Sequence, residues 1–225
     1  MIFDAKDRVL FIGDSVSDFG RARPVGEGLH DGVGTGFIRV ISNFINGYYP
    51  ERNIRITNMG ISGNNVLDLD DRWQSDVLDL EPDWVNILIG INDVWRQFDT
   101  PDCCAKDCIT PEIYERTYRE LLDRTVPYVK GITLMTPYYM EPLKEDMMRK
   151  RMDEYVAAVK RIAKDYGFIC IDLQRVFDEY LKVRHSSYLT WDRVHPNGTG
   201  ATLIAMEFLK EVGFDFSRLS RALSQ

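Results

Sequence analysis

The sequence predicts an α/β protein, a flavodoxin-like three-layer α/β/α sandwich around a five-stranded parallel sheet. Short apolar runs alternate with amphipathic stretches along the chain. This alternation indicates strands joined by helices, and therefore a parallel sheet that is covered on both faces. Several runs are apolar almost throughout, which is typical of strands buried on both sides. The expected strands are residues 8–12, 54–58, 84–89, 132–135 and 168–171.

Helical patterns fill the intervals between these strands. Residues 37–48 form one amphipathic pattern, and residues 111–128 form another, which starts with a proline as the first turn of a helix allows. A third helix is expected to end at Gly167. Its apolar stripe, at spacings of three and four, consists of Met148, Met152, Tyr155, Val159, Ile162 and Tyr166. A last helix follows His195 and is expected to turn inward Ile204, Phe208, Leu209 and Val212.

Length and composition exclude several classes of protein. The 225 residues suffice for one sizeable core, so we expect a single domain over 1–225. A net charge of -7 without a basic stripe argues against nucleic acid as a partner. No apolar run approaches the ~20 residues that span a bilayer. The first strand also begins too close to Met1 to leave room for a signal peptide, so we expect a cytoplasmic protein without a membrane partner.

The segment CCAKDC places Cys103, Cys104 and Cys108 together. Its spacing matches none of the usual zinc patterns, and no histidine lies near it. We therefore expect reduced thiols, no bound metal and no structural disulfide. The glycines near residues 26–36 do not follow a strand at the spacing of a dinucleotide-binding loop, so no nucleotide cofactor is expected either.

Two segments at opposite ends of the chain carry the residues of nucleophilic catalysis. VLFIGDSVSD places Ser15 directly after the first strand, and WDRVHP places Asp192 three residues before His195. A serine, a histidine and a carboxylate supply a nucleophile, a base and a group that orients the base. Structural roles remain open, because a serine here can also cap a helix and a histidine can cap a loop. His30 and His185, the other histidines, have no carboxylate placed in this way.

Two further motifs follow the second and third strands. NMGISGN contains Gly63, and GINDVW contains Asn92. Each alone is compatible with an ordinary turn. Because the carboxyl ends of parallel strands meet at one edge, the N–H groups of Ser15 and Gly63 and the Asn92 amide are expected to converge there as an oxyanion hole. The glycine-rich loop of residues 20–36 is expected to cover the same edge.

The chain resembles the SGNH (GDSL) hydrolases. GDS with Ser15, the second block with Gly63, GIND with Asn92, and DRVH with Asp192 and His195 match their four blocks in order, across nearly the whole chain. The resemblance implies a flavodoxin-like fold, ester hydrolysis through an acyl-enzyme, and no metal or other cofactor. There is no G-x-S-x-G, so the nucleophile elbow of the α/β-hydrolases is not expected.

A narrower likeness suggests the substrate. The segments GRARPVGEG, GTGF, EPDWVNILIGINDVWRQFD, LMTPYYME and WDRVHPN resemble the intracellular acetylxylan esterases of this superfamily. That likeness implies removal of acetyl groups from short xylo-oligosaccharides, through an acetyl-enzyme on Ser15, by a homo-oligomer. Alternative functions are a thioesterase or lysophospholipase type of hydrolase of other small esters, or a carbohydrate-binding protein without catalytic activity.

Four residues near the catalytic motifs are candidates for contact with a sugar. Flat aromatic rings beside polar groups suit the faces and hydroxyl groups of sugars. The tryptophans can instead be packing residues, and Trp191 can lie at a contact between subunits. The candidates are Trp95, Arg96, Tyr138 and Trp191.

Overall fold

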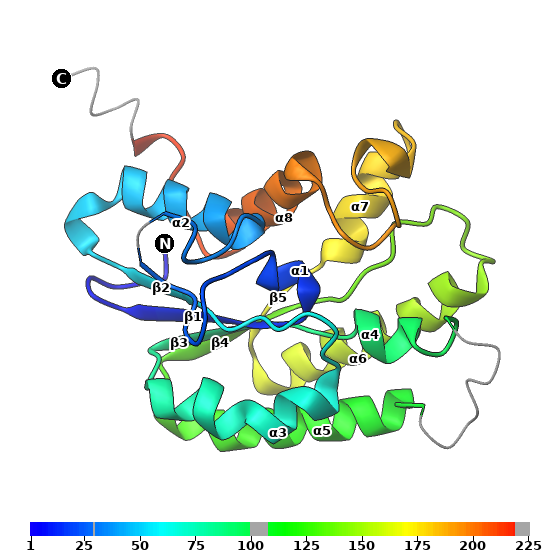
Figure 1. The fold of residues 1–225 in the computed structure, drawn as a ribbon, viewed down its shortest axis with the longest axis horizontal. Coiled ribbons are helices and arrows are strands. Elements are labelled where there is room, and N and C mark those ends of the chain that lie inside the picture. Colours follow the sequence, from blue (N-terminus) through cyan, green and yellow to red (C-terminus); the bar gives the residue numbers. More distant parts are fainter. Residues whose placement is uncertain (29, 100–107, 219–225) are drawn as a thin grey trace.

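The computed structural model describes residues 1–28, 30–99 and 108–218. Within them, five strands form one sheet in which every neighbouring pair is parallel, in the order β2-β1-β3-β4-β5. Figure 1 shows helices on both faces of this sheet, which confirms the expected three-layer α/β/α fold. Each strand end lies within one residue of its expected position. The strands are β1 (Arg8–Gly13), β2 (Arg55–Asn58), β3 (Trp84–Leu88), β4 (Gly131–Met135) and β5 (Ile169–Ile171).

The longer helices form the two outer layers. Figure 1 shows α2, α7 and α8 on one face of the sheet and α3, α5 and α6 on the other. The short helices α1 and α4 follow β1 and β3 directly. The bounds are α1 (Ser15–Asp18), α2 (Phe37–Tyr48), α3 (Val66–Asp76), α4 (Ile91–Trp95), α5 (Pro111–Thr125), α6 (Met147–Tyr166), α7 (Leu173–Leu181) and α8 (Gly198–Glu211). None of the helices in the described residues is long and apolar enough to cross a membrane.

The helices expected from the sequence are present. α6 ends where expected, because Gly167 takes φ 71° and its N–H donates to the carbonyls of the last turn. α5 ends three residues before the expected boundary at residue 128. The segment Val126–Tyr128 forms a 3-10 helix instead, because Pro127 has no N–H to continue an α-helix. The inward stripes of α6 and α8 are buried, apart from Tyr166, which is half-buried.

The sequence analysis did not identify α3 and α7. α3 nevertheless begins with a capping box, in which the Asn65 side chain accepts from the N–H of Asp68 and the Asp68 carboxylate accepts from the N–H of Asn65. The indole of Trp73 is fully buried, and its N–H donates to Thr125 Oγ1 at 2.9 Å. This contact joins α3 to the end of α5 on one face of the sheet.

The order of the strands brings three loops together. β1 lies between β2 and β3, and its residues Phe11 and Gly13 pair with Asn58 and Leu88. The chain therefore leaves β1, β2 and β3 at neighbouring points of one sheet edge. These three exits are the segments that carry the sequence motifs with Ser15, Gly63 and Asn92.

Candidate active site

Ser15 opens the short helix α1 immediately beyond β1. The Asp14 carboxylate caps this helix by accepting the N–H of Val16 at 2.9 Å. Close packing under the turn requires glycine at position 13, since a Cβ there would approach the Leu88 carbonyl oxygen to 2.1 Å. The Ser15 side chain is thereby held at the sheet edge, and its hydroxyl faces the loop that carries His195.

The Ser15 hydroxyl meets His195 across 180 positions of sequence. Oγ of Ser15 lies 2.7 Å from Nε2 of His195, and Nδ1 of the same ring lies 2.5 Å from Oδ2 of Asp192. A proton on Nδ1 faces the carboxylate, so Nε2 is the acceptor for the serine hydroxyl. The structure thus brings the three expected residues into one line of hydrogen bonds, the arrangement that a serine nucleophile, its base and an orienting carboxylate require.

The Asp192 carboxylate also holds the loop that carries His195 through hydrogen bonds. Its Oδ1 accepts the N–H groups of Val194 at 2.9 Å and His195 at 2.8 Å, and the hydroxyl of Thr190 at 2.9 Å. Burial acts to raise the pKa of Asp192, but the hydrogen bonds from His195, Val194 and Thr190 outweigh it and hold this pKa below its usual value. Asp192 therefore stays ionised opposite the imidazole near neutral pH.

Gly63 lies in the loop after β2, and Asn92 lies in the short helix α4 after β3. Gly63 has φ 88°, in the left-handed region that favours glycine. Asn92 is buried in α4, and its amide nitrogen donates to the carbonyl of Asn64 at 2.9 Å. An amide nitrogen has two hydrogens, so this bond fixes the Asn92 side chain and leaves its second N–H for another acceptor.

Arg72 supports these loops from α3. Its guanidinium donates to the backbone carbonyls of Gly13 and Met59 and to the side-chain oxygen of Asn64, at 2.7 to 3.1 Å. The end of β1 and the loop after β2 are therefore tied to one side chain. Five donors in a planar group suit arginine to such a junction.

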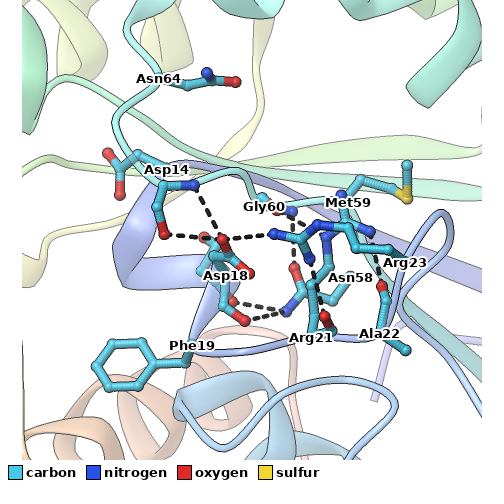
Figure 2. A network of polar contacts seen from close by, with 12 residues as sticks. Asp14, Asp18, Phe19, Arg21, Ala22, Arg23, Asn58, Met59, Gly60 and Asn64 are labelled. Atoms are coloured by element: carbon cyan, nitrogen blue, oxygen red, sulfur yellow. Dashed lines mark hydrogen bonds and ion pairs between the residues drawn. The ribbon is translucent and has the colours of Figure 1, made fainter.

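A second polar network ties α1 to the loop before Gly63. Oδ2 of Asp18 accepts the N–H and the hydroxyl of Ser62 at 3.0 and 2.8 Å, and the Arg23 guanidinium at 2.7 Å. Arg21 donates to the Gly60 carbonyl at 2.7 Å. Figure 2 shows Asp18, the last residue of α1, beside these arginines, which come from the glycine-rich loop after α1.

The fully buried side chain of Asn58 completes the network. Its amide donates to the carbonyls of Ser17 at 2.6 Å and Val33 at 2.9 Å, and its oxygen accepts the N–H of Gly60. The contacts of Arg21, Arg23 and Val33 place parts of the 20–36 loop at the sheet edge where the sequence analysis expected it. That analysis did not single out Asp18, although GDSVSD puts its carboxylate on the same helix as the serine.

Two carboxyl groups are buried beneath the site. Burial raises the pKa of Asp14 to about 7, with the nearby Asp93 adding to the effect, and burial likewise raises the pKa of Asp93 to about 7. Oδ1 of Asp93 accepts the N–H of Val66 at 3.0 Å, which joins the loop of Asn92 to the start of α3. Oδ2 of Asp93 has no hydrogen-bond partner among the described residues.

Two tryptophans flank the imidazole of His195. The rings of Trp191 and Trp95 each have centroids 6.0 Å from that of His195, with interplanar angles of 15° and 53°. Trp191 is 86% exposed, whereas Trp95 is half-buried. Arg96 follows Trp95 on the surface and pairs with Asp99 at 2.6 Å. The structure therefore places Trp95 and Trp191 beside the His195 ring, and Arg96 is the residue after Trp95 at the end of α4.

Tyr138 is placed differently from the expectation. It is 3% exposed, its ring packs 4.4 Å from that of Phe177, and its hydroxyl donates to the Val194 carbonyl at 3.0 Å. The expected contact with sugar is thus corrected to a contact beneath the His195 loop. Apolar residues around Tyr138 exclude solvent, and the short chain after β4 turns its ring inward.

The described residues offer no metal site. Across the described parts of the chain, no group of three or more His, Cys, Asp or Glu side chains is arranged to hold a metal ion. Cys103 and Cys104 of the CCAKDC segment lie outside the described residues.

The chain is similar to well-characterised proteins over nearly its full length. It is 48% identical to the acetylxylan esterase of Geobacillus stearothermophilus over 212 residues, which are 94% of this chain and 96% of that protein. The crystal structure of that enzyme matches with a TM-score of 0.93 at 46% identity, covering 96% of this chain and 98% of the other. Variants described as its catalytic mutants replace a serine, an aspartate or a histidine by alanine.

A further match is an α/β hydrolase from the metagenome of Lake Arreo, Spain. Its crystal structure gives a TM-score of 0.92 at 46% identity and covers 95% of this chain and 98% of the other. The model of the GDSL-like lipase/acylhydrolase family matches residues 11–203, which include every residue of the hydrogen-bonded line from Ser15 to Asp192. This chain therefore belongs to the GDSL-like lipase/acylhydrolase family.

Proposed function

We propose that this protein is a serine carbohydrate esterase that removes O-acetyl groups from short xylo-oligosaccharides. The observation that carries the proposal is the 2.7 Å contact between Ser15 Oγ and His195 Nε2, continued at 2.5 Å to Asp192. This line makes Ser15 the nucleophile, His195 the base and Asp192 the group that orients it. The choice of an acetylated sugar is supported by the acetylxylan esterase that shares 48% of its residues.

In the first half-reaction, Oγ of Ser15 attacks the acetyl carbonyl carbon while Nε2 of His195 accepts the hydroxyl proton. The resulting oxyanion accepts the N–H groups of Ser15 and Gly63 and the second amide N–H of Asn92. His195 then gives its proton to the sugar oxygen, the bond from this oxygen to the acetyl carbon breaks, and an acetyl group remains on Ser15.

In the second half-reaction, a water molecule replaces the sugar. His195 accepts one proton of this water as its oxygen attacks the acetyl carbon, and the same three donors bind the new oxyanion. When this intermediate collapses, the proton returns from His195 to Ser15 Oγ and acetate leaves. Asp192 stabilises the imidazolium in both halves without taking up a proton itself.

The side chains around His195 suit the proposed substrate. The free face of Trp191 offers a flat apolar surface to a sugar ring, and Trp95 forms another wall. The guanidinium of Arg96 lies at the exposed end of α4 and offers donors to sugar hydroxyl groups. We propose these three side chains as the substrate contacts.

We further propose that the protein works in the cytoplasm as a homo-oligomer, with residues 1–225 as one domain and no nucleic acid or membrane partner. Support comes from the likeness to intracellular acetylxylan esterases and from the exposed indole of Trp191. Light scattering coupled to size-exclusion chromatography tests the assembly, and a monomer at micromolar concentration would refute it.

The central experiment measures acetate released from acetylated xylo-oligosaccharides by the wild type, Ser15→Ala and Ser17→Ala. Ser17 is the matched control, because it lies on the same helix and its hydroxyl has no partner among the described residues. Release that is lost only in Ser15→Ala supports the proposal. Rapid cleavage of an aryl acetate without release from the sugar would retain the serine mechanism and reject the substrate.

The preferred length of the acyl chain separates a sugar acetylesterase from the other hydrolases considered. A sugar acetylesterase prefers acetyl over octanoyl esters, whereas a thioesterase or lysophospholipase type of hydrolase cleaves the longer chain at least as well. Binding of the acetylated sugar without any turnover would favour a carbohydrate-binding protein.

A further inference from the structure

The residue between Asp192 and Val194 has an unusual backbone. Arg193 takes φ 67°, in the left-handed region where a Cβ is unfavourable and glycine is the usual residue. Such a conformation persists only where the surrounding structure imposes it, and it concentrates at functional sites. Arg193 lies inside the loop that holds both Asp192 and His195.

This conformation serves the loop. Oδ1 of Asp192 accepts the N–H groups of Val194 and His195, so the chain turns back under the carboxylate at position 193. Oδ2 of the same carboxylate then remains free for Nδ1 of His195. The left-handed turn at position 193 therefore determines how the imidazole is presented to Ser15.

The Arg193 side chain and backbone fasten this turn to the segment after β4. The guanidinium pairs with Glu141 at 2.5 Å, and the Arg193 carbonyl accepts the N–H of Met140 at 2.9 Å. A hydrogen bond with Tyr139 and the charge of Glu141 raise the pKa of Arg193. The guanidinium therefore stays charged beside Glu141.

Glu141 is a rigid partner for Arg193. It is buried, its Oε1 accepts the N–H of Leu143 at 2.8 Å, and its carbonyl accepts the guanidinium of Arg149 at 2.7 Å. Arg149 is itself buried and makes two hydrogen bonds to Asp178 at 2.7 and 2.8 Å. Glu141 therefore sits on a fixed network that reaches from α6 to α7.

We propose that Arg193 is a positioning residue: through its ion pair with Glu141, it holds the Asp192–His195 loop in the left-handed turn that aims the imidazole at Ser15. The inference rests on the proposed function, because it assigns Arg193 a role in that same catalytic line. The competing explanation is that arginine is merely tolerated where glycine would serve better.

Arg193→Gly separates the two explanations. Glycine suits the backbone at φ 67°, so this variant removes the side chain without adding strain, and the Glu141 variant below controls for the backbone freedom that glycine adds. We expect kcat for an aryl acetate to fall about ten- to a hundredfold, with KM changed less than about twofold because the substrate contacts remain. Arg193→Lys, which keeps the charge, should recover part of kcat.

The partner variant tests the ion pair itself. Glu141→Gln keeps the oxygen that accepts from Leu143 and removes the charge, so it should reproduce the loss in kcat. The double variant Arg193→Gly/Glu141→Gln should be no slower than either single variant, since both changes break one interaction. Lys6→Gly is the matched control, because Lys6 has φ 70° but lies at the far end of β1.

A spectroscopic readout keeps this test independent of turnover. The far-downfield proton resonance of the hydrogen bond between His195 and Asp192 should weaken or shift in Arg193→Gly and stay unchanged in Lys6→Gly. An unchanged resonance with wild-type kcat would overturn the inference, as would a loss confined to KM, which indicates substrate contact. A wild type without Ser15-dependent hydrolysis would overturn the proposed function instead, while the resonance still reports on Arg193.

Discussion

The indole of Trp191 lies parallel to the imidazole of His195, with 6.0 Å between the ring centroids and 15° between the planes. One face of the indole therefore covers the base of the proposed catalytic line, and most of the side chain remains in contact with solvent. This arrangement places an apolar surface immediately beside the ring that we propose protonates the leaving sugar.

Trp191→Ala is expected to weaken binding of the sugar more than the chemistry. Loss of an aromatic contact of about 0.5–1.5 kcal/mol corresponds to a rise in KM of roughly two- to tenfold for acetylated xylo-oligosaccharides. An aryl acetate lacks the sugar, so its kcat/KM should change little. Tyr188→Ala, another exposed aromatic of the same region, is the control. Equal effects on both substrates would argue against sugar stacking.

Asn92→Ala is expected to lower kcat about a hundred- to a thousandfold, because one of three oxyanion donors is removed. The same change also removes the hydrogen bond to the Asn64 carbonyl. Circular dichroism and the thermal unfolding midpoint must therefore accompany the kinetics. Full activity in a folded Asn92→Ala protein would exclude this amide from the oxyanion hole.

Asp18→Ala is expected to reduce kcat about ten- to a hundredfold by releasing Ser62, the neighbour of Gly63. Ser62→Ala keeps the bond from the Ser62 N–H and should lose less. Arg23→Met removes the ion pair but leaves both contacts of Ser62, so it should lose least. Steady-state kinetics on an aryl acetate orders the three variants, and an equal loss in all of them would contradict a specific role of Ser62.

Asp93→Asn is expected to change how stability depends on pH. Burial raises the pKa of Asp93 to about 7 in the folded state, against about 3.9 for an unfolded aspartate. Between pH 4 and 7 the folded protein keeps a proton that the unfolded chain has lost. The stabilisation from this group is therefore complete below pH 4 and declines as pH rises to 7.

Asparagine has no carboxyl proton to lose, so the stability of the variant does not show the decline that the wild type owes to Asp93. Its free energy of unfolding relative to the wild type should increase with pH, by up to roughly 1.4 kcal/mol per pH unit, and then level off above pH 7. Urea denaturation at pH 5, 6, 7 and 8 measures the difference, with Asp31→Asn on the surface as control. A difference that is independent of pH would contradict the assignment.

The strands and the catalytic line were accessible from sequence because each depends on local features. Apolar runs mark strands such as β1, and Ser15 and His195 stand in short motifs whose place follows from the parallel sheet. Asn65, the N-cap of α3, is a helix-start signal that the sequence contains. The apolar pattern of α3 alone is too weak to predict the helix. The strand ends differ from the expected ones by at most one residue, and the larger shift at the end of α5 results from Pro127.

Other features depend on distant contacts that no local pattern carries. The burial of Tyr138 results from Phe177 and from the His195 loop, which are remote in sequence. Asp18 and Ser62 meet only because β2 lies beside β1. The left-handed backbone of Arg193 could not be predicted from the sequence either, since arginine is not a residue that suggests positive φ.

The 180-residue separation between Ser15 and His195 has a consequence for synthesis of the chain. A nascent polypeptide that ends before residue 192 already contains the proposed nucleophile and the three proposed oxyanion donors, but it lacks the proposed base. α8, which packs against α2, comes still later from the ribosome. We therefore expect esterase activity only after residues 192–195 have been synthesised, and its onset during translation would report the moment when this segment docks.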